Sequence, residues 1–160
     1  MKNGIGVGIE LKVFLDTSAL FAVVYSETGG ARLLLKLGEA EAIELWAGPW
    51  VLRETDAVLD RKSPGSKPYF AVLLDRARMR VGTEAVQEAL DQALSAVDYQ
   101  PDAQVVAEAL TIHADYFVTF DRKHLIENPQ TAALPFPIGT SGDFLAWYRK
   151  RITIPPEGPA

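Results

Sequence analysis

The sequence contains no cysteine, which excludes a disulfide framework and any zinc site built on thiolates. No apolar run approaches the roughly 18 residues that a membrane-spanning helix needs. The first ten residues carry one lysine and three glycines but no continuous apolar stretch, so they do not resemble a secretory signal. We therefore expect a protein of the cytoplasm that does not associate with membranes.

Positive charge is also scarce. The chain has 16 Lys and Arg residues against 21 Asp and Glu residues, and its formal net charge is −5. This balance argues against a protein that holds nucleic acid by bulk electrostatic attraction. It does not exclude a nuclease, because an acidic metal pocket with a local basic rim gives the same net charge.

Short apolar runs alternate with segments of helical period along the chain. The 160 residues, 48% of them hydrophobic, suit a single domain. The alternation predicts an α/β fold, a three-layer sandwich with a mostly parallel central sheet flanked by helices. We expect strands at 11–16, 42–46, 116–119 and 134–138, and helices at 19–25, 31–37, 50–62, 69–80, 84–97, 101–113 and 144–150. The domain should span 11–152, between a flexible segment 1–10 and a disordered tail 153–160.

Several element ends follow from single residues. Prolines in 134–138 place that strand at a sheet edge. Gly38 is expected to stop the second helix, and Thr83 to cap the helix over 84–97. The inward side of that helix is predicted to carry four apolar residues, Val86, Leu90, Leu94 and Val97.

Two expected strands end in an aspartate. The run Val13-Phe14-Leu15 leads into Asp16, and Thr17 or Ser18 can then cap the following helix. The run 116–120 leads into Asp121 in the same way. Open α/β sheets bind ligands at the carboxyl ends of their strands, so both acids are candidate site residues.

Two further acids lie on helices. Glu54 shares a helix face with Val51 and Val58, although it could equally reach water or pair with Arg53 or Arg61. Asp102 precedes the inward stripe of its helix, where an N-terminal cap is the simpler reading, and Asp98 competes with it for any functional role.

If the four acids converge, their charges must be compensated. Two charges about 4 Å apart repel by about 4 kcal/mol at an effective dielectric near 20. Because a domain is stable by only ~5–15 kcal/mol, the cluster must hold protons or divalent cations. Carboxylate-rich sites favour Mg²⁺ or Mn²⁺, which activate water and neutralise charge on a phosphodiester.

The order of these motifs resembles the PIN domain, the nuclease fold of VapC-type toxins. The matching segments are Asp16-Thr17-Ser18, Glu54 in 50–54, Asp102 in 102–107, and Thr119-Phe120-Asp121, with 137–145 similar to the family's last strand and helix. The likeness spans about 12–148. Phe120 departs from the pattern, since family members often carry a small residue there.

The resemblance implies a metal-dependent endoribonuclease that cleaves RNA phosphodiesters, with Asp16, Glu54, Asp102 and Asp121 as catalytic metal ligands. It implies Ser18 and Thr119 as supporting polar groups near a Mg²⁺ or Mn²⁺ ion. It also implies a homodimer and, in the toxin branch, inhibition by a small antitoxin protein. The family has members outside toxin–antitoxin pairs, so a nuclease with another role stays open.

The histidines and a short basic run can each be interpreted in two ways, and the whole chain has two rival functions. The two histidines, His113 and His124, are interpreted as structural or surface residues, with His124 the better candidate for contacting substrate. The basic run 149–151 suits a solvated helix end, or else contact with phosphate. The rival functions are a catalytically silent RNA- or protein-binding module on the same fold and, less favoured, a phosphotransfer receiver domain, which needs paired acids near its start.

Overall fold

The computed structural model describes residues 10–26 and 29–153. Within these residues the strands form one sheet in the order β3-β2-β1-β4-β5, and every neighbouring pair is parallel. The strands are β1 (Lys12–Leu15), β2 (Glu44–Ala47), β3 (Arg80–Val81), β4 (Tyr116–Val118) and β5 (Ile138–Gly139). The predicted α/β fold with a parallel sheet is confirmed. Of the expected flexible segment 1–10 and tail 153–160, residues 1–9 and 154–160 lie outside the described residues, as does part of the turn before Gly30.

The two central strands are the most apolar parts of the sheet. Phe14 in β1 and Phe117 in β4 are fully buried, and their rings stack with centroids 5.4 Å apart. Strands covered on both faces need such continuous apolar runs. The edge strand β3 is exposed along its length. β5 lies at the other edge, as the prolines predict, but it covers only Ile138–Gly139 and not the expected 134–138.

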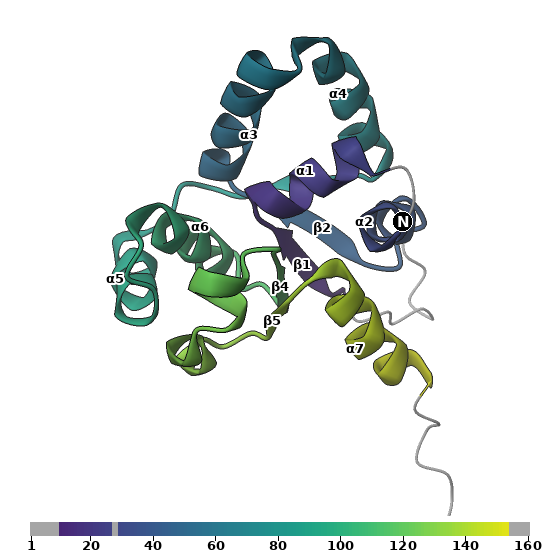
Figure 1. Cartoon of the computed structure of the whole chain (residues 1–160). Helices are drawn as coiled ribbons and strands as arrows, with labels where there is room; N and C mark the ends of the chain where they lie inside the picture. Colours follow the sequence, from purple (N-terminus) through teal and green to yellow (C-terminus); the bar gives the residue numbers. More distant parts are fainter. Residues whose placement is uncertain (1–9, 27–28, 154–160) are drawn as a thin grey trace, which may run out of the picture.

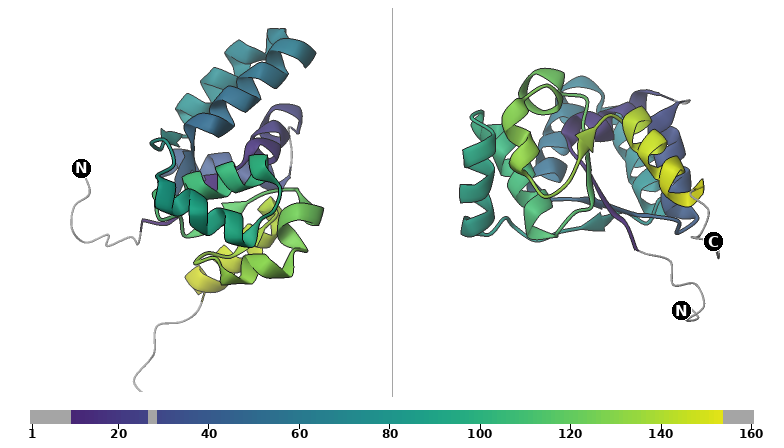
Figure 2. Two further views of the ribbon diagram at one scale, coloured as in Figure 1. Left: turned by 90° about the vertical axis from the view of Figure 1, so that its left-hand side faces the viewer. Right: turned by 90° about the horizontal axis from the view of Figure 1, so that it is seen from below.

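Helices cover both faces of the sheet (Figures 1 and 2). α5 and α6 lie together on one side, whereas α1, α2 and α7 lie on the other, and α3 and α4 run side by side and project beyond the sheet. None of the helices in the described ranges has the length and apolar character needed to cross a bilayer. Their bounds are α1 (Thr17–Tyr25), α2 (Gly30–Glu39), α3 (Pro49–Lys62), α4 (Lys67–Arg76), α5 (Gln87–Ala96), α6 (Gln100–Thr111) and α7 (Ser141–Thr153), with short helical turns at Pro64–Ser66, Arg122–Ile126 and Pro129–Ala133.

Two predicted helix ends are wrong. α2 continues through Gly38 to Glu39. A Cβ at Gly38 would lie 2.7 Å from the carbonyl oxygen of Ala77 and 2.8 Å from Leu45, so glycine is required there for close packing rather than to end the helix. The helix predicted over 69–80 ends at Arg76, because the chain turns at Arg78 with a φ of 57° and then pairs with β2 as β3.

The predicted inward side of the helix over 84–97 is also wrong in part. The helix begins only at Gln87, with Val86 as its N-cap, so Thr83 caps nothing. Val86 and Leu94 are exposed, whereas the small residues Ala89, Ala93 and Ala96 are buried. α5 and α6 lie against each other, and small side chains permit two helices to approach closely.

Candidate active site

Asp16 stands at the point where β1 becomes α1. Its Oδ1 accepts hydrogen bonds from the Ala19 amide (2.9 Å) and from the Ser18 hydroxyl (2.7 Å). Asp16 itself is therefore the N-cap of α1, and the prediction that Thr17 or Ser18 would be the cap is wrong. The side chain is only 7% exposed, and this burial raises the pKa of Asp16 to about 6 despite the hydrogen bonds it accepts.

Ser18 and Thr119 join the ends of the two central strands. The Ser18 hydroxyl accepts a hydrogen bond from the amide of Phe120 (2.9 Å) and lies 3.4 Å from the hydroxyl of Thr119. The Thr119 hydroxyl in turn accepts from the amide of Asp121 (3.0 Å). The two polar residues therefore fix Asp121 close to Asp16, and the charge of Asp121 acts to raise the pKa of Asp16.

Asp102 reaches the same place from the first turn of α6. Its Oδ2 is buried and accepts no hydrogen bond from the residues that the structure describes. Burial, followed by the charge of Asp121, raises the pKa of Asp102 to about 7. The charge of Asp16 acts in the same direction, so Asp102 on α6 and the aspartates that follow β1 and β4 influence one another. Asp98, the competing residue, is exposed.

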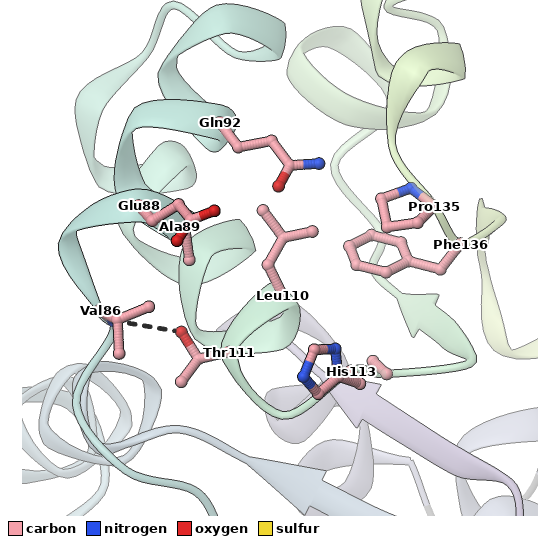
Figure 3. A pocket seen from close by; sticks show the side chains of 10 residues that line it. Val86, Glu88, Ala89, Gln92, Leu110, Thr111, His113, Pro135 and Phe136 are labelled. Atoms are coloured by element: carbon pink, nitrogen blue, oxygen red, sulfur yellow. Dashed lines mark hydrogen bonds between the residues drawn. The ribbon is translucent and has the colours of Figure 1, made fainter.

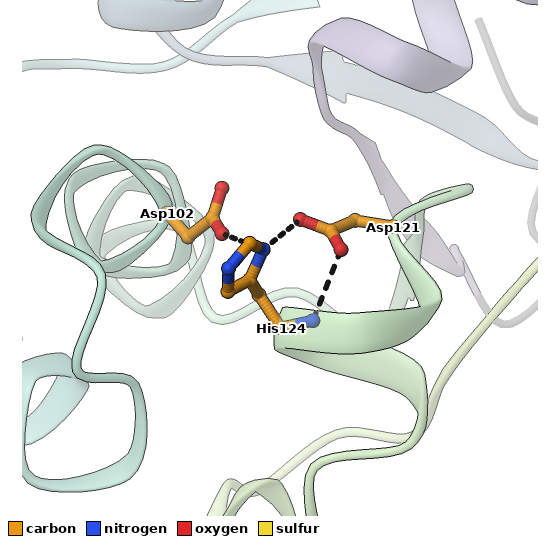
Figure 4. A group of neighbouring side chains, drawn as sticks. All are labelled: Asp102, Asp121 and His124. Atoms are coloured by element: carbon orange, nitrogen blue, oxygen red, sulfur yellow. Dashed lines mark hydrogen bonds and ion pairs between the residues drawn. The ribbon is translucent and has the colours of Figure 1, made fainter.

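His124 lies between two of these acids (Figure 4). Its Nδ1 is 3.1 Å from Oδ2 of Asp121 and 3.5 Å from Oδ2 of Asp102, and its amide donates to Oδ1 of Asp121 (3.0 Å). Burial acts to raise the pKa of Asp121, but the hydrogen bonds from His124 and Asp102, together with the charge interaction with His124, outweigh it and the pKa is lowered. The spacing of three residues between Asp121 and His124 was the available sequence signal for this contact.

Glu54 lies at the margin of the cluster. Its Oε1 accepts a hydrogen bond of 2.5 Å from the hydroxyl of Thr17, the residue next to Asp16. Arg53, one of its possible partners, instead forms an ion pair of 3.2 Å with Glu84. Among the described residues, the potential ligand atoms that lie within 4.8 Å of one another belong to Asp102, Asp121 and His124. Asp16 and Glu54 therefore lie near this group but are not members of it.

Sequence reasoning missed Glu108. This glutamate on α6 is 1% exposed, and its Oε2 accepts from the amide of Trp50 (2.7 Å) while Oε1 accepts from that of Val51 (3.4 Å). It supplies the cap that Gly48 cannot give to α3, the helix that carries Glu54. A charged residue within the apolar run 105–110 was the sequence signal.

The donor set fits a divalent cation. The atoms that face one another are carboxylate oxygens and one imidazole nitrogen, and Oδ2 of Asp102 has no hydrogen-bond donor of its own. Carboxylates at such separations repel one another unless protons or a cation compensate their charge. Oxygen-rich sites of this kind suit Mg²⁺ or Mn²⁺.

A separate hollow of about 590 Å³ lies between α5, α6 and the segment before β5 (Figure 3). Leu110, His113 and Phe136 are among the residues that line it. Its polar groups are partly used within the protein, since the Thr111 hydroxyl donates to Ala107 and accepts from the amide of Val86. It does not contain the acidic cluster.

The site and topology together define a class: a parallel α/β domain that places acids at the carboxyl ends of its central strands. No protein-family model and no curated protein sequence matches the chain. Solved structures do match. VapBC2 from Rickettsia felis, bound to a DNA fragment from its promoter, gives a TM-score of 0.59 at 12% identity, over 80% of this chain and 97% of that one.

Two further structures match over most of their length. VapC20 from Mycobacterium tuberculosis, a toxin that cleaves the sarcin–ricin loop, gives a TM-score of 0.52 at 19% identity, over 76% of this chain and 95% of that one. PAE2754 from Pyrobaculum aerophilum gives a TM-score of 0.52 at 14% identity, over 92% of this chain and 97% of that one. This chain therefore has the VapC-type PIN fold, as the sequence motifs predicted.

Proposed function

We propose that this protein is a metal-dependent endoribonuclease that cleaves RNA phosphodiester bonds, and that it is the toxin of a toxin–antitoxin pair. The observation that carries the proposal is the meeting of Asp102, Asp121 and His124 at one edge of a sheet with the VapC-type fold, with Asp16 joined to that edge through Ser18 and Thr119. One matching structure is of a toxin that cleaves the sarcin–ricin loop, which supports RNA as the substrate class.

The four acids have distinct places in the proposed site. Asp16, Asp102 and Asp121 would hold a Mg²⁺ or Mn²⁺ ion, and Glu54 would complete the set from α3. Ser18 is a supporting group because it holds one oxygen of Asp16. Thr119 supports Asp121 in the same way through its amide.

The cation supplies charge neutralisation for the phosphodiester and activation of water in an in-line displacement. The protein orients the acidic side chains of the site. Asp16 is fixed by two hydrogen bonds at the start of α1, and Asp121 is fixed by the amide of His124. The hydroxyl of Thr17, the residue next to Asp16, donates to Glu54 and so holds this side chain beside the same edge.

We also propose an antitoxin partner, a homodimeric assembly and a cytoplasmic location. The likeness to VapBC2, solved with DNA from its promoter, supports a partner of the antitoxin type. Expression of this chain alone should arrest growth, and the arrest should require Asp121. Co-expression of a short neighbouring reading frame should relieve it.

The decisive experiment measures cleavage of an RNA substrate by the purified protein with Mn²⁺. Asp121→Asn should reduce the rate by at least the roughly 10- to 100-fold that loss of a partner around a metal site costs. EDTA should abolish cleavage. Asp75→Asn, which removes the same charge from an exposed position on α4, is the matched control.

Unchanged cleavage by both Asp121→Asn and Asp16→Asn would refute catalysis at this site. Wild-type protein that binds RNA without cleaving it, with or without Mn²⁺, would favour the silent binding module on the same fold. An active nuclease that does not arrest growth would place the enzyme outside toxin–antitoxin pairs.

A further inference from the structure

The spacing around His124 matches that of ligands on one ion. Its Nδ1 lies 3.1 Å from Oδ2 of Asp121 and 3.5 Å from Oδ2 of Asp102 (Figure 4). With bonds of about 2.1 Å, two ligand atoms at right angles lie about 3.0 Å apart, and two at a tetrahedral angle lie about 3.4 Å apart. The nitrogen is therefore separated from each oxygen as two ligands of one cation would be, and all three atoms lie within 4.8 Å of one another.

The ring of His124 is held in this orientation from two sides. It stacks on the ring of Tyr99, with centroids 5.0 Å apart and planes 17° apart. Its backbone amide donates to Oδ1 of Asp121, which caps the short helical turn that carries the histidine. A ligand that is oriented before binding loses less conformational entropy when the ion arrives.

We infer that His124 is itself a ligand of the cation and gives this site a preference for Mn²⁺ over Mg²⁺, an inference that rests on the proposed metal-dependent nuclease. Mg²⁺ prefers oxygen ligands and dehydrates reluctantly, whereas imidazole suits transition metals. To hold the ion, Nδ1 would have to give up any hydrogen that it carries, and the ring hydrogen would then lie on Nε2. The hydrogen from Nδ1 passes to solvent, directly or in exchange for one taken up at Nε2.

A competing role would give the opposite result. His124 could act as a substitute for the cation, pairing with the two carboxylates and leaving when the ion binds. In that case the removal of His124 would strengthen binding of both metals, or leave it unchanged, because a competitor is lost. If His124 is a ligand, its removal instead weakens the binding of Mn²⁺ much more than the binding of Mg²⁺.

The first measurement uses the wild-type chain and requires no variant. Electron spin echo envelope modulation of bound Mn²⁺ should show ¹⁴N coupling, and incorporation of ¹⁵N-histidine should convert it to ¹⁵N coupling. Calorimetry of His124→Leu should then show an increase of about tenfold or more in the Kd for Mn²⁺, and a much smaller change for Mg²⁺. His113→Asn is the matched control: it removes the other histidine, and Asn tolerates the φ of 57° at that position.

The outcomes separate this inference from the proposed function. Mn²⁺ that binds and supports RNA cleavage without histidine coupling would overturn the ligand role and leave the nuclease intact. Tighter or equal binding of both metals by a folded His124→Leu variant would do the same. Absence of any Mn²⁺ or Mg²⁺ binding by the wild-type chain would overturn both.

Discussion

Glu108 gives the sharpest test of the physical reasoning, because it is a buried carboxylate that joins two helices of the site. Its oxygens accept hydrogen bonds from the amides of Trp50 and Val51 at the start of α3. Burial raises its pKa from 4.5 to about 7, against the opposing effect of these two amides. That difference corresponds to about 3 kcal/mol, since each pH unit is worth about 1.4 kcal/mol.

The direction of the pH dependence follows from the protonation of Glu108 in the folded and the unfolded state. Between pH 4.5 and 7 the carboxyl group of Glu108 is protonated in the folded protein but ionised in the unfolded chain. The stability that the group contributes is therefore fully present below pH 4.5 and is lost as the pH rises through 7. Glu108→Gln cannot ionise, yet its amide oxygen can still accept the hydrogen bond from Trp50.

Wild type and Glu108→Gln should therefore differ in how the free energy of unfolding depends on pH. Relative to wild type, the free energy of unfolding of Glu108→Gln should rise by about 2–3 kcal/mol between pH 5 and pH 8. Urea unfolding with EDTA at both pH values measures this without a contribution from bound metal. Glu127→Gln, at an exposed position, is the control and should change the free energy much less.

A difference that stays constant between pH 5 and 8 would refute the reasoning. It would mean that Glu108 is already ionised in the folded state at pH 5. The positive end of the α3 dipole and the two amides would then outweigh the cost of burying the charge.

Two further predictions test how α3 is attached to the rest of the site. Gly48→Ala should lower the free energy of unfolding by roughly 1–3 kcal/mol, measured by urea titration. A Cβ at this position would lie 2.1 Å from Oε1 of Glu108 and would displace the cap of α3. A variant as stable as wild type would show that the cap can move without cost. Thr17→Val keeps the side-chain shape but removes the hydrogen bond to Glu54. Calorimetry should therefore show Mn²⁺ binding weakened roughly 10-fold, with little loss of stability. Unchanged affinity for Mn²⁺ would place Glu54 outside the metal site.

Local pattern was sufficient for the elements that lie at the centre of the fold. The apolar runs before Asp16 and Asp121 predicted β1 and β4, because strands buried on both faces must be apolar throughout. Their position also brought both aspartates to the same end of a parallel sheet. The helix expected over 50–62 matches α3 to within one residue, and α3 begins at Pro49 because proline fits the first helical turn.

Features that depend on distant partners were missed or assigned wrongly. β3 exists because Arg80 and Val81 pair with β2, more than 30 residues earlier in the chain, and nothing in their local sequence marks a strand. The buried side of α5 is set by its close approach to α6, which selects small residues rather than the larger ones of the predicted stripe.

The sequence by itself determined the α/β class, the two central strands and the acids at their ends, because these follow from periodicity within a few neighbouring residues. Only the tertiary structure decided that His124 faces Asp102 and Asp121, and that Glu108 caps a helix 58 residues away. Such contacts depend on how helices pack on the sheet, and a side chain's own sequence neighbours do not specify which distant group it meets.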